Sequence, residues 1–150
     1  MTARDELIDM RPIGVVANAG DDVARVDWSG ARSEIHLDAR YVDALLGLGD
    51  YSHILVIAWL DRIPEELRGR LRAYPSGDER YPVQGAFALR GGARPNPLSV
   101  TVCRLLRVDG TRLRVEGLDL VDRTPVLDIK PYIAHYDAVP QATLPRWAGG

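Results

Sequence analysis

The chain of 150 residues is poor in several features, and each scarcity narrows what the protein can be. It has one cysteine, Cys103, so no intrachain disulfide can form, which fits a reducing cytoplasm. Its first residues are polar and charged, unlike a signal peptide, and no apolar run approaches the roughly 20 residues that span a bilayer. We therefore expect a cytoplasmic protein without a membrane segment.

Lysine is equally scarce, since Lys130 is the only one among 19 basic residues. The net charge is −2, so the chain as a whole does not attract nucleic acid, and such binding would require a local basic patch.

Metal ligands are also few. His36 and His135 have no ligand spacing to each other or to Cys103, so we predict no metal site.

The chain does contain many short apolar segments with turn residues between them, a pattern typical of strands. The expected strands cover residues 13–17, 23–28, 33–37, 51–60, 84–88, 98–108, 111–116 and 124–130. One short helix is expected at 39–46, after a capping Asp38, and Asp109-Gly110 predicts a tight hairpin. Because no Gly-x-Gly-x-x-Gly follows the first strand, the pattern favours a mainly β barrel or sandwich over a Rossmann fold.

The length predicts a single domain over residues 1–150, with a core at about 11–137 between a flexible N-terminal lead and a C-terminal tail. Within it, the strand 51–60 is apolar almost throughout and is expected to be buried on both faces. The strand 98–108 is expected to have one apolar face, on which Arg104 is out of place. That face comprises Val100, Val102, Leu106 and Val108.

Two stretches differ from ordinary packing sequence. In the first, Gly91 and Gly92 allow a close approach of the backbone to a ligand, and prolines on both sides of Asn96 restrict the backbone, so Arg90 and Arg94 are held on an ordered loop. The second stretch, residues 117–132, carries three aspartates and a lone lysine among apolar residues, which suggests a site.

Together the two stretches resemble the TsaA-like family. The resemblance rests on Phe87-Ala88-x-Arg90, on Arg94-Pro95-Asn96-Pro97 and on the run from Leu118 to Tyr132, and it extends from about Ile13 to about Tyr136. It implies a small β-barrel that binds S-adenosylmethionine as a homodimer. It further implies a methyltransferase that acts on N6 of threonylcarbamoyl-adenosine in tRNA.

The cofactor side follows from this resemblance and from the chemistry of the ligand. Arg90 could bind the cofactor's carboxylate, and Asp119 and Asp122 its ribose hydroxyls and ammonium. The full predicted cofactor set is Asp61, Arg62, Arg90, Leu98, Asp119, Leu120, Val121 and Asp122. The alternative is that Arg90 and Arg94 pair with nearby aspartates and only pin two loops together.

The acceptor side is predicted from the end of the second stretch. Lys130 could stabilise an anion on the acceptor, Asp128 could hold Lys130, and Tyr132 could stack on a base, so Lys130 and Tyr132 are the candidate catalytic residues. The alternative is a local ion pair with Tyr132 in the core. Arg94 and Asn96 are candidate substrate residues together with Asp128, although a scaffolding role in their loop is equally consistent with the sequence.

The chain departs from the family pattern in segments that are expected to select the cofactor and the substrate, which we call the rim. It lacks a Pro-Arg-Gln segment after the first strand, and Asp61-Arg62 stands where the family has His-Gln. The alternative functions are therefore a methyltransferase for another small acceptor, or a non-catalytic S-adenosylmethionine-binding module. A possible tRNA patch of arginines between residues 62 and 80 is interrupted by acidic residues, which favours a solvated loop.

Overall fold

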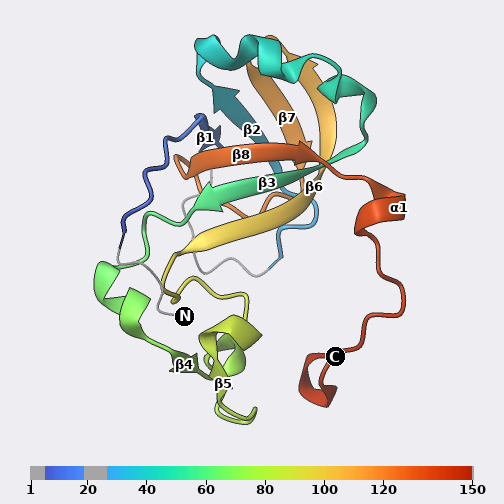
Figure 1. Cartoon of the computed structure of the whole chain (residues 1–150). Coiled ribbons are helices and arrows are strands. Elements are labelled where there is room, and N and C mark those ends of the chain that lie inside the picture. Colours follow the sequence, from blue (N-terminus) through green and yellow to red (C-terminus); the bar gives the residue numbers. More distant parts are fainter. Residues whose placement is uncertain (1–5, 19–26, 150) are drawn as a thin grey trace.

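Six strands of the chain close into a barrel in the order β1-β2-β7-β6-β3-β8, with every neighbouring pair antiparallel (Figure 1). The computed structural model describes residues 6–18 and 27–149. The barrel strands are β1 (Gly14–Ala17), β2 (Arg32–Leu37), β3 (His53–Trp59), β6 (Leu98–Asp109), β7 (Arg112–Glu116) and β8 (Pro125–Pro131). The predicted mainly β barrel is thereby confirmed.

The remaining elements are short. A two-stranded sheet pairs β4 (Arg72–Ala73) with β5 (Gln84–Gly85), and the single α-helix is α1 (Ala134–Asp137) among the described residues. The 3-10 helices are η1 (Ala39–Leu45), η2 (Leu48–Asp50), η3 (Glu65–Gly69), η4 (Pro75–Gly77), η5 (Ala86–Ala88) and η6 (Arg146–Ala148). Where the structure describes the chain, it contains no helix long and apolar enough to cross a bilayer.

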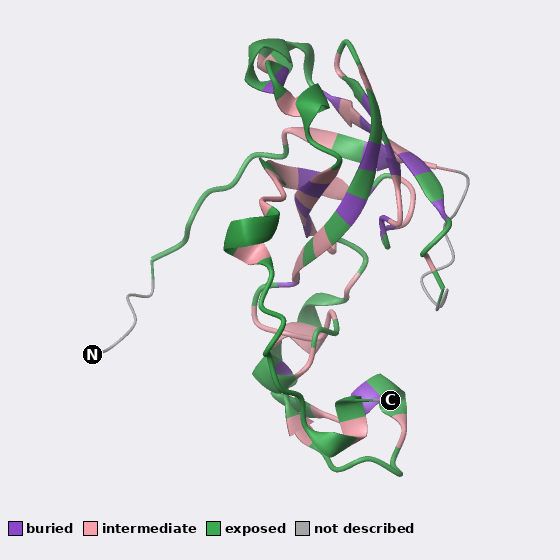
Figure 2. Ribbon diagram, turned by 90° about the vertical axis from the view of Figure 1, so that its right-hand side faces the viewer, coloured by how far each residue is buried: buried purple, intermediate pink, exposed green. Residues whose placement is uncertain are grey.

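The core lies inside the barrel because alternate residues of each strand point inward. Figure 2 shows buried and exposed residues alternating along the strands. The side chains without any exposed surface include Val16, Ile35, Ile54, Val56, Leu113, Val115 and Val126, which come from five of the six strands. Cys103 on β6 is also buried, which confirms it as a core residue.

Several predicted elements differ from the structure. The helix expected at 39–46 is the 3-10 helix η1, although Asp38 caps it as predicted by accepting a hydrogen bond from the Arg40 N–H. β3 is buried on its inner face only, because its outer side chains face no second layer and are half-buried. The strand expected at 84–88 ends at Gly85. Of the strand expected at 23–28, residues 23–26 lie outside the described residues, and 27–28 are not strand.

The four apolar residues predicted to share one face of β6 lie on two faces: Val100, Val102 and Leu106 are on the outer face, and Val108 packs against the core. Val100 and Val102 are 49% and 46% exposed, while Thr101 and Cys103 point inward. A β-bulge between Leu105 and Arg107 then reverses the alternation, because an extra residue shifts the strand by one position. Arg104 is therefore a normal outward-facing residue.

Candidate functional site

The site lies where β6 and β7 separate. Their ladder ends at the pair Arg104–Glu116, so the first half of β6 is paired with β3 alone. Gly117 follows with φ of +87°, a left-handed conformation that favours glycine, and its N–H donates to the Ala31 carbonyl at 2.8 Å. The next residues therefore leave the barrel wall, and a hollow opens between them, the segment after β3 and the loop that carries Arg90.

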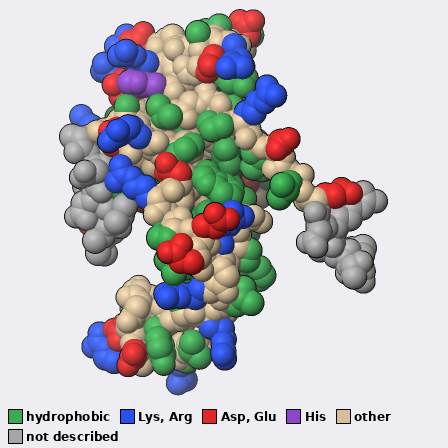
Figure 3. Space-filling model, turned by 90° about the vertical axis from the view of Figure 1, so that its left-hand side faces the viewer, with side chains coloured by type: hydrophobic (Ala, Val, Ile, Leu, Met, Phe, Trp, Pro, Cys, Tyr) green, Lys and Arg blue, Asp and Glu red, His purple; other side chains and the backbone are tan. Residues whose placement is uncertain are grey.

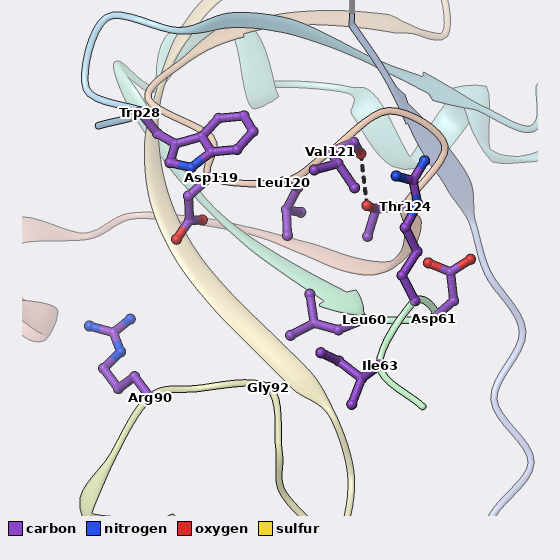
Figure 4. A pocket seen from close by; sticks show the side chains of 11 residues that line it. Trp28, Leu60, Asp61, Ile63, Arg90, Gly92, Asp119, Leu120, Val121 and Thr124 are labelled. Atoms are coloured by element: carbon purple, nitrogen blue, oxygen red, sulfur yellow. Dashed lines mark hydrogen bonds between the residues drawn. The ribbon is translucent and has the colours of Figure 1, made fainter. Parts of the chain in front are cut away.

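This inner hollow has a volume of about 380 Å³ (Figure 4). It is lined by Trp28, Leu60, Asp61, Arg62, Ile63, Arg90, Gly92, Asp119, Leu120, Val121 and Thr124. The walls combine an indole and aliphatic side chains with two carboxylates and two guanidinium groups. Such a lining suits a ligand with an apolar body and charged ends.

Six of the eight predicted cofactor residues meet at this hollow although they come from three separate segments. They are Asp61, Arg62, Arg90, Asp119, Leu120 and Val121. Leu98 lies beside it, in a second hollow on the outer side of β6 that we call the outer groove. The outer groove shares Arg90 and Asp119 with the inner hollow, so these two residues lie between the two spaces.

Asp122, the eighth predicted residue, does not line the hollow itself but holds the segment that forms its wall. Its Oδ1 accepts a hydrogen bond from the Asn18 N–H at 3.0 Å, and its carbonyl accepts one from Arg62 Nη2 at 3.3 Å. Asn18 also donates to the Leu120 carbonyl at 2.9 Å. The end of β1 therefore holds the wall of the hollow, and the Asp122 carboxylate contacts backbone.

A tight turn closes that wall. Arg123 has φ of +67°, unusual for a residue with a side chain, and its N–H donates to the Val16 carbonyl at 2.8 Å. Thr124 Oγ1 donates to the Val121 carbonyl at 2.7 Å. The turn between the wall and β8 is thus held at both ends.

Arg90 and Asp119 lie on opposite sides of the opening, as Figure 4 shows. Arg90 Nη2 donates to the Val100 carbonyl on the unpaired edge of β6 at 2.9 Å, and the residue is otherwise exposed. Asp119 Oδ1 accepts a hydrogen bond from Thr101 Oγ1 at 2.5 Å. Each charged group is thus anchored on β6 by one contact and retains atoms that can reach a ligand.

The loop that carries Arg90 is braced by other arginines. Arg94 Nη1 donates to the carbonyls of Leu89 and Gly91 at 2.9 and 3.0 Å. Arg68 donates to the Pro95 carbonyl at 2.7 Å and to Asn96 Oδ1 at 3.2 Å. Arg94 and Asn96 line the outer groove, but these contacts show that they also scaffold the loop.

Lys130, Tyr132 and Asp128 are not brought to the inner hollow. On the outer face of the sheet, Lys130 lies opposite Leu55 and Asp128 opposite Ile57, while Thr124 at the other end of β8 lines the hollow. Six residues of strand separate Thr124 from Lys130, about 20 Å. Lys130 Nζ is 3.0 Å from an Asp128 oxygen, so the local ion pair forms.

His53 adjoins this outer group. Its ring lies 6.4 Å from that of Tyr132 in an edge-on arrangement, and its Nδ1 is 2.8 Å from Ser52 Oγ. Tyr132 is partly exposed and so does not belong to the core. Among the described residues no cluster of three metal-binding side chains occurs, and the absence of a metal site stays a prediction.

Five residues of the site were not predicted, of which Leu60 and Ile63 supply an aliphatic wall. Trp28 is the only aromatic residue in the described lining of the inner hollow, Thr101 binds Asp119, and Thr124 closes the turn. Only Trp28, an aromatic residue beside the turn at Ser29-Gly30, carried a signal that sequence reading could have used. The roles of the two threonines follow only from the tertiary structure, which gives their hydrogen-bond partners.

These observations define a small β-barrel protein with a hollow whose opening is flanked by opposite charges. A family model described as the tRNA-methyltransferase O N-terminal domain matches residues 25–138. The chain belongs to this family, which confirms the resemblance stated from the motifs.

Two relatives of this chain have names that refer to S-adenosylmethionine. A probable S-adenosyl-L-methionine-binding protein of Methanothermobacter thermautotrophicus is 41% identical over 139 residues, covering 90% of this chain and 97% of the relative. A putative S-adenosylmethionine-dependent methyltransferase of Pseudomonas aeruginosa, RcsF, is 40% identical over 100 residues, covering 67% of this chain and 41% of the relative.

Solved structures show the same fold. The crystal structure of TrmO from Pseudomonas aeruginosa matches with a TM-score of 0.76 and 29% identity over 96% of this chain. Another crystal structure of TrmO matches with a TM-score of 0.74 and 31% identity over 94% of this chain. This chain spans 64% and 62% of those two chains, less than two thirds of their length.

Proposed function

We propose that this protein is a cytoplasmic S-adenosylmethionine-dependent methyltransferase that modifies N6 of threonylcarbamoyl-adenosine in tRNA. The observation that carries the proposal is the convergence of Asp61, Arg90 and Asp119, from three separate segments, on one hollow with apolar walls. Membership of the family supports the class of reaction, and names of relatives support the cofactor.

The residues of the hollow fit this cofactor. Arg90 would pair with its carboxylate, because a guanidinium presents several N–H donors in the plane that a carboxylate needs. Asp119 would accept hydrogen bonds from the ribose hydroxyls or the ammonium. Leu60, Ile63 and Leu120 would contact the apolar parts. When bound, the cofactor supplies the activated methyl group, and the task of these residues is to orient it.

The outer groove is the natural place for the acceptor. It has a volume of about 700 Å³ and shares Arg90 and Asp119 with the inner hollow, so a group bound there lies next to a ligand in the hollow. Arg94 and Asn96 lie along it. The groove is open to solvent beside the unpaired edge of β6, which suits a nucleotide presented by a larger molecule.

A homodimer is part of the proposal. The outer faces of β6 and β3 expose an apolar patch of Leu55, Ile57, Val100 and Val102, bordered on β8 by Asp128 and Lys130. A second copy that covers this patch would remove its apolar surface from water. Because Val100 and Val102 also line the outer groove, the second copy would form one wall of that groove. Lys130 borders the patch and would lie at that interface, and we propose that it acts with Tyr132 on the acceptor there.

One observation favours the alternative functions. Asp61 and Arg62 lie in the lining where the TsaA-like resemblance expects His-Gln, and a second cation in the hollow disfavours a sulfonium close by. A methyltransferase for another small acceptor, or a non-catalytic S-adenosylmethionine-binding module, would tolerate this change at the rim.

The test begins with calorimetric titration of the purified protein with S-adenosylmethionine and its demethylated product. We expect saturable binding near one site per chain, and no binding at millimolar ligand would remove the cofactor from the proposal. Methyl transfer to threonylcarbamoyl-adenosine-containing tRNA is then followed by mass analysis of the nucleosides. Cofactor binding without a methylated nucleoside would select the alternative functions.

A further inference from the structure

The outer faces of β2, β7 and β6 carry charged side chains in three rows, which we call the arginine face. The rows follow the strand register as Arg32–Glu116–Arg104, Glu34–Arg114–Arg107 and His36–Arg112–Asp109. With His36 neutral, five arginines stand against three carboxylates, so the face has a net charge of +2 in a chain whose net charge is −2. Figure 3 shows basic side chains gathered beside a histidine at the upper left of the molecule.

One pair in this face is unfavourable within the chain itself. Arg107 and Arg114 lie directly opposite each other in the β6–β7 ladder, and like charges in that position destabilise a sheet. The bulge before Arg107 produces this pairing, and bulges often turn a side chain toward a site. Glu34 and Asp109 approach the two guanidinium groups only to 3.8 Å, and such exposed pairs contribute little.

The two facing arginines also share a hollow. Arg107, Arg114 and Arg32 line a depression of about 530 Å³ whose carboxylate is Glu34. Guanidinium groups bind phosphate oxygens through parallel N–H donors, and a phosphate between them would relieve their mutual repulsion. We propose that this hollow binds a phosphate group of an RNA backbone.

The position of the face supports RNA as the carrier of the phosphate. Its first row, at Arg104 and Glu116, is the last pair before β6 and β7 separate to form the inner hollow. Arg104 is three residues from Thr101 at the outer groove, about 10 Å along the strand. A backbone bound on the arginine face would thus lead to the groove. The choice of RNA rests on the proposed function, whereas the phosphate site does not.

The test compares Arg107→Gln, Arg114→Gln and the double variant with wild-type protein. Binding of a fluorescent RNA stem–loop is measured by anisotropy over a series of salt concentrations. Because each lost phosphate contact removes released counterions, the slope of log K against log salt should fall by about 0.7–0.9 for each arginine replaced. Arg146→Gln is the matched control, since Arg146 is exposed in η6 of the C-terminal tail, away from the arginine face and from the arginines between residues 62 and 80.

Folding is checked by thermal unfolding, where the single variants should keep or raise the midpoint because they relieve a repulsion. A salt slope unchanged from wild type, or changed equally by Arg146→Gln, would overturn the site. Binding to phosphatidylserine vesicles that depends on these arginines, with RNA binding unaffected, would overturn the choice of RNA. Titration with S-adenosylmethionine on the same samples separates this outcome from a failure of the proposed function.

Discussion

Thr101 and Asp119 join the two sides of the site by one hydrogen bond, in which Thr101 Oγ1 donates to Asp119 Oδ1 at 2.5 Å. Thr101 belongs to β6, and Asp119 to the segment that leaves the barrel after Gly117. The bond fixes one carboxylate oxygen of Asp119 and leaves the other available to a ligand. Thr101 is therefore a positioning residue for Asp119.

Replacing Thr101 by valine keeps the shape of the side chain and removes the hydrogen-bond donor. A hydrogen bond to a charged group is worth about 1.5–3 kcal/mol, so we expect the affinity for S-adenosylhomocysteine, the demethylated product of the cofactor, to fall by about tenfold or more. Thr101→Ser keeps the hydroxyl and should restore most of the affinity. Calorimetric titration measures both, and equal affinities in the two variants would assign Thr101 a packing role only.

Arg90→Ala should weaken cofactor binding without unfolding the protein. Arg90 is exposed and makes its described hydrogen bond to one backbone carbonyl, so the midpoint of thermal unfolding should change little. Loss of a charge-assisted contact to the ligand should lower affinity by about 10- to 100-fold. Arg80→Ala serves as the control for loss of a positive charge. Unchanged affinity in a folded Arg90→Ala protein would remove Arg90 from the site.

Gly92→Ala tests the size of the inner hollow. A Cβ at this position would lie 2.6 Å from Ile63 Cδ1, so the Ile63 side chain must move within the hollow that both residues line. We expect weaker ligand binding with a modest loss of stability, because the displaced atoms end a flexible side chain. At Gly91 a Cβ meets nothing within 4 Å, so Gly91→Ala is the matched control and should bind normally. Equal affinities would place the ligand elsewhere.

The Cys103 thiol should be unreactive in the folded protein. Burial raises the pKa of Cys103 to about 12, and the charge of Asp119 adds to the rise. The unfolded thiol ionises near its ordinary pKa of 9.0, so its contribution to the free energy of unfolding should be constant below that pH and be lost as the pH rises toward 12. Iodoacetamide labelling at pH 8 should be slow until urea unfolds the chain, and fast labelling of native protein would contradict this.

Val102→Glu tests the proposed dimer. Val102 is 46% exposed at the centre of the apolar patch, so a carboxylate there costs a monomer little but would be buried in a dimer. We expect light scattering to report a dimer for wild type and a monomer for the variant. Val139→Glu is the control, since Val139 is 65% exposed and lies in the C-terminal tail. A wild-type monomer would remove the dimer from the proposal.

Much of the local structure could be read from the sequence. Asp109-Gly110 predicted the hairpin between β6 and β7, and Gly110 indeed has φ of +59°. Asp38 predicted a helix start, although not that the helix would be 3-10. The four apolar residues of β6 were predicted to share one face, and they do not, because the bulge after Leu105 shifts the alternation and depends on pairing with β7.

The amino-acid sequence alone determined most of the strands, the main turns and the family, because side-chain alternation, glycine conformation and the two motifs are local properties of the chain. Only the tertiary structure decided which motif residues meet. Closure of the barrel brings Asp61, Arg90 and Asp119 to one hollow and leaves Lys130 on an outer face. The reason is physical: where the β6–β7 ladder ends, and where its bulge turns Arg107 opposite Arg114, depends on pairing between distant segments that no single stretch encodes.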